Sequence, residues 1–220
     1  MYVAIVRSLV IVVSILLSTM TNAAQRQSVN ALYIPLADHY AAIIAYERYR
    51  KHMQHADFKL EEMTDWNLLR AKFQSGVVDM AFIISPLAMA MYHEKADFQW
   101  IGLMHRDGNA LAINELLNSQ VTLEKDRRNR KPNGEVAKAI KKAYLEKNRS
   151  IEIGMPHLLS THTVILHRYL KENGLRLSLA PNEKAEVHAI AISPSKSPYF
   201  IKSKNTRYTA AAFEQSLPWA

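Results

Sequence analysis

The stretch Ile151–His162 (IEIGMPHLLSTH) decides how the chain folds, because a short apolar strand gives way to a polar loop and then to an apolar-striped helix. Ser160 and Thr161 are residue types that begin helices, so the unpaired backbone N–H groups of the first helical turn would face the loop. Those donors, the helix dipole and the rings of His157 and His162 can attract an anion or a polar acceptor. The alternative is that Ser160 only caps the helix and both histidines are solvated.

Two earlier stretches repeat the order of strand, polar loop and helix. Val29–Pro35 is an apolar segment that stops at a proline, and Asp38 stands where a helix with apolar spacing begins. Val77–Ile84 is a nearly continuous apolar run, typical of a parallel strand buried on both faces, and Ser85-Pro86 follows at a helix start. Ligands bind at the carboxyl ends of strands in open α/β sheets, so these loops are candidate ligand loops. Asp38 as a helix cap is the alternative to ligand contact.

The remaining chain continues the same alternation. Further strands are predicted at 58–63, 98–105, 110–114 and 187–192, and further helices at 66–75, 136–146 and 163–173. This order is typical of an α/β fold with parallel sheets. We divide the chain into a first lobe at 28–114, a basic helical insertion or linker at 115–150, and a partial second lobe at 151–220.

The first 24 residues have the pattern of a secretory signal peptide. Arg7 supplies a positive start, Leu9–Leu17 a short apolar run, and Thr21–Ala24 a small-residue cleavage site. We therefore predict a cleaved signal and a periplasmic location, with an uncleaved anchor as the alternative. The chain contains no cysteine, which excludes a thiolate metal site, a thiol nucleophile and any disulfide.

The positive charge of the chain is concentrated in one segment. The net charge is +8, and the segment from Lys125 to Arg149 holds ten basic and three acidic residues. Tyr144 is its only aromatic residue, whereas single-stranded nucleic acid is bound on several aromatic rings. We interpret the segment as a solvated helix and loop, and no nucleic-acid partner is predicted.

Three segments are similar to a known family. They are 34–42 (IPLADHYAA), 65–90 with its DWNLLRAKF, SGVVDMA and SPLAMA stretches, and 155–162 (MPHLLSTH). Together they resemble the substrate-binding proteins of ABC importers for nitrate, bicarbonate, sulfonates and taurine, and relatives that bind thiamine precursors. The resemblance implies a two-lobed type 2 periplasmic-binding-protein-like fold that closes around its ligand by a hinge motion. Family members usually continue further, so the second lobe is expected to be incomplete.

The resemblance also implies a ligand site, a function and partners. The ligand would be a small anionic or polar solute delivered to an importer permease by a monomeric protein, without catalysis, cofactor or metal. His157 is the first choice for a direct hydrogen bond, and Trp66 either packs on the ligand or belongs to the core. The implied ligand-binding residues are Asp38, His39, Trp66, Ser85, Pro86, His157, Ser160, Thr161 and His162.

Other functions remain open at this stage. A ligand-sensing domain and an enzyme similar to the thiamine pyrimidine synthase would share the fold. A hydrolase built from Ser160, His162 and Asp38 is disfavoured, because the Gly-x-Ser-x-Gly motif is absent. His157, His162 and His167 recur every five residues, a spacing that does not place them on one helix face as metal ligands.

Overall fold

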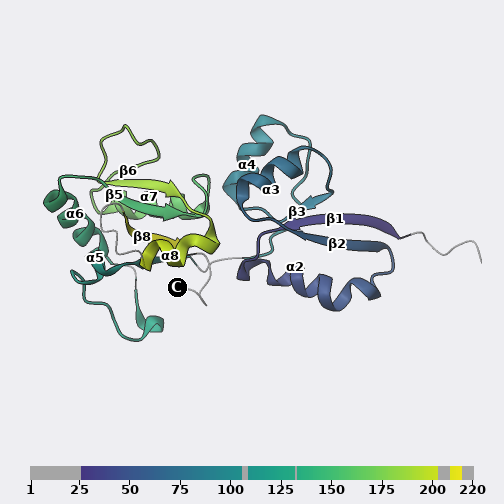
Figure 1. Ribbon diagram of the computed structural model, residues 1–220, viewed down its shortest axis with the longest axis horizontal. Coiled ribbons are helices and arrows are strands. Elements are labelled where there is room, and N and C mark those ends of the chain that lie inside the picture. The colour runs from purple at the N-terminus through teal and green to yellow at the C-terminus, as the bar shows by residue number, and fades with distance from the viewer. Residues whose placement is uncertain (1–25, 106–108, 132, 203–208, 215–220) are drawn as a thin grey trace, which may run out of the picture.

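The computed structural model describes residues 26–105, 109–131, 133–202 and 209–214, which form two lobes side by side (Figure 1). The expected signal peptide at 1–24 lies outside the described residues. No described helix is both long enough and apolar enough to cross a membrane.

The first lobe is built on a parallel three-stranded sheet with the order β2-β1-β3. The strands are β1 (Gln27–Tyr33), β2 (Ala56–Glu62) and β3 (Met80–Ala81). Ala31 of β1 lies opposite Leu60 on one side and Met80 on the other, so β1 is the central strand. Ala31 and Leu32 are accordingly almost fully buried.

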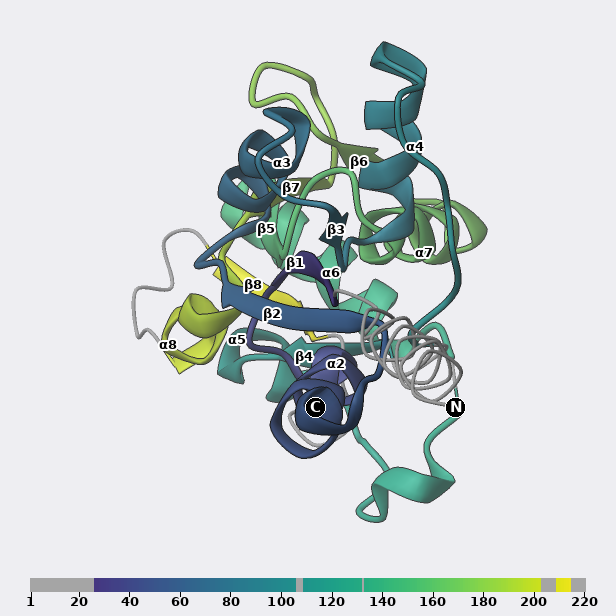
Figure 2. The same ribbon diagram turned by 90° about the vertical axis from the view of Figure 1, so that its right-hand side faces the viewer.

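Helices cover both faces of this sheet. Figure 2 shows α3 (Trp66–Gln74) and α4 (Ser85–Glu94) on one side of β1 and β2, and α2 (Tyr40–Ile44) on the other. The α2 helix continues through a π-helical turn (Ala45–Tyr49) and a 3-10 turn (Arg50–His52). The core between the sheet and the α3–α4 pair includes Leu32, Ile34, Met63, Trp66, Leu69, Leu87 and Met91.

The second lobe is built on a five-stranded sheet with the order β4-β8-β5-β7-β6. All neighbouring strands are parallel except β4 and β8, which are antiparallel. The strands are β4 (Ala110–Ile113), β5 (Ile151–Met155), β6 (Leu177–Ser178), β7 (Val187–Ala191) and β8 (Thr209–Glu214).

The helices of the second lobe pack on this sheet through apolar stripes. They are α5 (Glu115–Asn118), α6 (Glu135–Lys147), α7 (Thr161–Glu172) and α8 (Ser197–Lys202), with 3-10 turns at Arg127–Asn129 and Pro194–Lys196. The α6 stripe of Ala137, Ile140 and Ala143 shares one core with residues of β5 and α7. The lysines of α6 are exposed, in agreement with the solvated basic face that the sequence predicts.

The α/β class and the two-lobed arrangement agree with the sequence analysis, but the division between the lobes differs. Strand β4, placed in the first lobe on sequence, pairs with β8 in the second sheet. The segment 115–150, expected as an insertion or linker, contributes α5 and α6 to the core of the second lobe. The sequence analysis overlooked the buried alanine stripe of α6 because many residues of this helix are charged. This stripe determines where the helix packs.

Two predicted strands were also wrong in extent, and one strand was missed. Residues 98–105 form no strand, and Trp100, Ile101 and Leu103 are exposed there because no neighbouring strand pairs with them. Only Met80–Ala81 of the run Val77–Ile84 pairs in the sheet, at its edge rather than its centre. Strand β8 lies in the tail after Ser193, where weak sequence periodicity gave no strand signal.

Candidate functional site

The carboxyl ends of the parallel strands of both sheets face the junction of the two lobes (Figure 1). From the first lobe, this edge carries the loops that follow β1, β2 and β3. From the second lobe, it carries the loops that follow β5 and β7. The candidate site residues lie on or beside four of these five loops, which is the edge where parallel sheets bind ligands.

The side chain of His39 contacts the backbone of its own loop, the loop after β1. The ring is buried, and Nδ1 lies 3.1 Å from the backbone nitrogen and 2.7 Å from the carbonyl oxygen of Ile34. The ring edge also meets Trp66, with centroids 5.9 Å apart and planes at 83°. Burial lowers the pKa of His39 to about 4, so the ring is neutral near pH 7. In this structure His39 is a packing residue of the loop.

Asp38 is the buried acid of the same loop. Its side chain is 4% exposed, and neither carboxylate oxygen has a hydrogen-bond partner in another described residue. Among the described residues, His105 comes within ion-pair distance, with its Nε2 3.9 Å from Oδ1. Burial raises the pKa of Asp38, and the nearby His105 works in the opposite direction. The alternative role as a helix cap is excluded, since α2 begins without a side-chain cap.

Trp66 belongs to the core. It is 1% exposed and packs with the apolar residues of β1, α3 and α4. It stands at the first turn of α3, and the preceding residue, Asp65, caps that helix by accepting hydrogen bonds from Asn67 N–H and Leu68 N–H, both at 2.9 Å. Of the two roles considered for Trp66, the structure therefore favours packing in the core.

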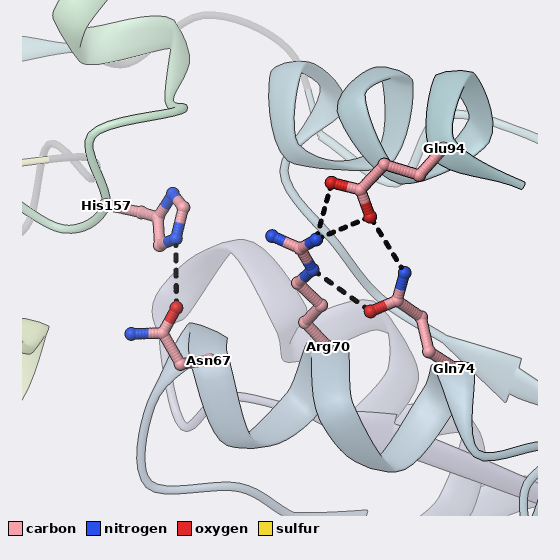
Figure 3. Close-up of polar contacts among 5 residues, drawn as sticks. All are labelled: Asn67, Arg70, Gln74, Glu94 and His157. Atoms are coloured by element: carbon pink, nitrogen blue, oxygen red, sulfur yellow. Dashed lines mark hydrogen bonds and ion pairs between the residues drawn. The ribbon is translucent and has the colours of Figure 1, made fainter.

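His157 makes a hydrogen bond between the lobes (Figure 3). Leu159 N–H donates to its Nδ1 at 3.0 Å, so the ring proton resides on Nε2. That Nε2–H then donates to Oδ1 of Asn67, 3.2 Å away on α3. Burial lowers the pKa of His157, and the positive charge of Arg70 adds to this effect. The sequence analysis identified His157 but missed Asn67, an ordinary surface residue type on a helix.

An ion pair supports the α3 side of this contact. Nη2 of Arg70 donates to both carboxylate oxygens of Glu94, at 2.7 and 2.6 Å, and Nε of Arg70 donates to Gln74 at 3.0 Å (Figure 3). The pair joins α3 to α4 within the first lobe. Because the guanidinium is already held by Glu94, Arg70 is not a free cation for a ligand.

Ser160 caps α7, as the sequence predicts. Its Oγ accepts a hydrogen bond from Thr163 N–H at 3.3 Å and lies 3.2 Å from Thr163 Oγ1. Ser160 is fully buried, whereas Thr161 is exposed. His162 is fully buried within the first turn, and burial lowers its pKa to about 4. Of the two histidines expected beside the loop, only His157 is therefore accessible to a ligand.

Ser85 and Pro86 open α4 after β3. Both are half-buried, and the side chain of the preceding Ile84 makes no cap. Pro86 in the first turn lacks an N–H group that would otherwise be unpaired there. The two residues lie at the strand edge that the sequence analysis proposes, and neither makes a hydrogen bond to a described residue of the second lobe.

A hollow that the sequence analysis missed lies after β7. Six residues line it: Ala191, Ile192, Ser193, Lys196, Tyr199 and Phe200. Ile192 N–H donates to the carbonyl of Met155 at 2.7 Å, so the hollow adjoins the loop that carries His157. Gly154 allows a close approach here, because a Cβ there would lie 2.7 Å from Cδ1 of Ile192 and 3.2 Å from Phe200 and would displace these side chains. The sequence analysis did not identify these residues because the segment after Ser193 shows no clear helix or strand periodicity.

The described residues contain no cluster of three or more histidine, aspartate or glutamate side chains arranged for a metal ion. Asp38 and His105 approach each other, but they form no such cluster with other described residues.

Two lobes whose strand ends meet at a shared junction define a two-lobed periplasmic-binding type of fold. A family model described as the NMT1-like family matches residues 22–219, and the chain belongs to that family. This confirms the resemblance to the nitrate, sulfonate and bicarbonate type of importer binding proteins. No significant match was found among curated proteins.

Solved structures support the fold. The ligand-binding component of an ABC-type import system from Staphylococcus aureus, solved with zinc bound, is similar with a TM-score of 0.60 and 18% identity. The match covers 86% of this chain and 55% of that one, so the chain spans about half the length of this relative.

Two further structures match less closely. They are a lipoprotein from Actinomyces odontolyticus (TM-score 0.46, 10% identity, covering 86% of this chain and 70% of that one) and a protein from Bacillus subtilis described as a methionine-binding lipoprotein (TM-score 0.42, 12% identity, covering 85% and 69%).

Proposed function

We propose that this chain is the solute-binding component of an ABC import system, and that it captures a small anionic or polar solute between its two lobes. The candidate solutes are of the nitrate, sulfonate, bicarbonate or thiamine-precursor class. Membership of the NMT1-like family supports this function. The observation that carries it is the hydrogen bond from His157 to Asn67, which brings a ligand loop of one lobe against the site edge of the other.

The same proposal places the protein outside the cytoplasm, in contact with an importer permease. An exported binding protein would load its solute when the lobes separate and enclose it when they close. Polar side chains from both lobes would enclose the solute, and the hydrogen bond between His157 and Asn67 and the buried carboxylate of Asp38 support this proposal.

A hydrolytic function has weaker support. Ser160 would have to be an exposed nucleophile, but its Oγ is buried and accepts a hydrogen bond from Thr163 N–H. Ser160 therefore stabilises a helix start, and we propose no catalytic role for it.

A thermal-shift screen with the full chain tests the proposed function. Nitrate, bicarbonate, taurine, alkanesulfonates and thiamine pyrimidine precursors would each be added at increasing concentration. At least one should raise the melting temperature in a saturable manner, because a ligand that binds only the folded state stabilises it. The His157→Ala variant should lose most of this shift.

His167→Ala is the matched control, because His167 is an exposed histidine on α7 with no role at the junction. Its ligand shift should equal that of the wild type. The proposed function fails if no compound shifts the melting temperature of well-folded, monodisperse protein.

A further inference from the structure

Asp38 differs from Ser160 and His157 at the lobe junction because its carboxylate makes no hydrogen bond with another described residue. Ser160 is satisfied by Thr163, and both ring nitrogens of His157 have partners. A carboxylate can accept about four hydrogen bonds. Asp38 accepts none from another described residue, although its side chain is 4% exposed. Buried acceptors of this kind are rare and call for a physical reason.

The surroundings of Asp38 determine which partner would suit it. On its own loop, the ring of His39 is neutral near pH 7. The segment between the lobes contributes His105 at 3.9 Å, too far for a hydrogen bond. No described lysine or arginine forms an ion pair with Asp38. The electrostatics here disfavour an anion and favour a group that donates hydrogen bonds.

The position of His105 relates this site to lobe movement. His105 lies in the stretch that leads from the first lobe to β4 of the second lobe, so movement between the lobes would displace it relative to Asp38. A carboxylate that is shielded from water binds a charged or polar N–H group more strongly than an exposed one.

Building on the proposed function, we propose that Asp38 receives an N–H-bearing group of the solute, either an ammonium or an amino group on a heterocycle, and that it selects against solutes that are purely anionic. Within the solute classes considered above, this favours amino-bearing members over nitrate, bicarbonate and simple alkanesulfonates. The carboxylate accepts the N–H groups through both oxygens, while the loops of the second lobe meet the rest of the solute.

Two pairs of probes test this by titration calorimetry on the full chain. Taurine and ethanesulfonate share a sulfonate but differ by an ammonium group. The compounds 4-amino-2-methylpyrimidine and 2-methylpyrimidine share a ring but differ by an amino group. The amino-bearing member of at least one pair should bind about 10- to 100-fold more tightly than its partner, the range expected for hydrogen bonds to a charged group.

Two variants assign that preference to Asp38. Asp38→Asn should abolish the difference within the pair. Asp57→Asn is the matched control, because Asp57 lies near the opposite end of β2, is exposed and pairs only with Lys59 among the described residues. It should keep the wild-type preference, and circular dichroism would confirm that both variants fold.

The outcomes separate this inference from the proposed function. If nitrate, bicarbonate or ethanesulfonate binds and neither amino-bearing probe binds more tightly than its partner, the role of Asp38 is refuted while the binding function stands. A preference that survives in Asp38→Asn also refutes it. If none of these compounds binds, the inference and the proposed function fall together.

Discussion

The loop after β1 and the loop after β5 occupy matching positions in the two lobes, yet they treat their polar residues differently. In the second lobe, Ser160 and His157 are hydrogen-bonded to their own loop or to Asn67. In the first lobe, His39 is hydrogen-bonded to Ile34, but the buried carboxylate of Asp38 has no hydrogen-bond partner in another described residue. The comparison indicates that the polar residues of the second-lobe loop are already hydrogen-bonded within the protein. In the first-lobe loop, the carboxylate of Asp38 is the group that a bound solute could supply with a hydrogen-bond donor.

Lowering the pH should have the largest effect on the free energy of unfolding, because each loop region contains one buried neutral histidine. Burial lowers the pKa of both His39 and His162 from 6.5 to about 4. The unfolded chain therefore binds more protons than the folded chain in this interval, and stability falls as pH drops from about 6.5 towards 4. Each shift corresponds to about 3 kcal/mol. Urea unfolding at several pH values should show the loss.

Single substitutions then show how much each lobe contributes to this pH dependence of the unfolding free energy. His39→Gln and His162→Gln should each flatten the dependence of the unfolding free energy on pH. Equal flattening would show that the two lobes share one cooperative transition. A pH-independent unfolding free energy in the wild type between pH 4 and pH 6.5 would contradict the buried, neutral state of both rings.

Trp66 tests whether the first lobe uses this residue for packing. Trp66→Ala should lower the free energy of unfolding by about 3–5 kcal/mol, because it removes a large side chain that is 1% exposed in the core. Trp100→Ala is the control, since Trp100 is 51% exposed and should change stability by less than about 0.5 kcal/mol. Chemical denaturation measures both. A small effect of Trp66→Ala on stability would contradict the packing role and favour a ligand-contacting role for Trp66.

Asp38→Asn should stabilise the protein, in contrast to substitutions in the second-lobe loop. The raised pKa means that the folded state favours the protonated acid, so this contribution is fully present below the unfolded pKa of about 3.8 and is lost as pH rises through the folded pKa. At pH 7 the charged group opposes folding, so its removal should raise the free energy of unfolding, as urea unfolding at pH 7 would measure. Well below pH 4 the variant and the wild type should be equally stable. Destabilisation at pH 7 would show that the pair with His105 supports the fold.

Ser160→Ala should cost about 1 kcal/mol, the usual penalty for losing a helix cap. The neighbouring Thr161→Ala is the control, because Thr161 is exposed and no side-chain bond to the backbone is found for it among the described residues. Thermal unfolding monitored by circular dichroism resolves the difference. If the two substitutions have equal effects, the hydrogen bond from Thr163 N–H does not stabilise α7.

The sequence predicted those parts of the site that depend on local rules. The capping role of Ser160 and the strand, loop and helix order around Asp38 follow from residue types and spacing. Contacts between the lobes could not be predicted in this way, because Asn67 and His157 are 90 residues apart and neither type requires the other. The burial of His162 was missed for a similar reason. A histidine at a helix start is compatible with solvent or core, and only the packing of α7 decides between them.

The smallest effect concerns the contact that joins the two regions. His157→Ala and Asn67→Ala should each destabilise slightly, and a double-mutant cycle should give a coupling of about 0.5–1 kcal/mol, as for a partly exposed neutral hydrogen bond. The cycle should be measured at about pH 7.5, where the lowered pKa keeps His157 neutral and its Nδ1 free to accept from Leu159 N–H. A cycle on Arg70 and Glu94, which both lie in the first lobe, provides the control and should show coupling that saturating ligand leaves unchanged. The coupling between His157 and Asn67 should instead change when solute is added, because a solute between the lobes must act on the contact that joins them. A coupling insensitive to solute would mean that this hydrogen bond fastens the lobes permanently, and that solute enters from elsewhere on the junction.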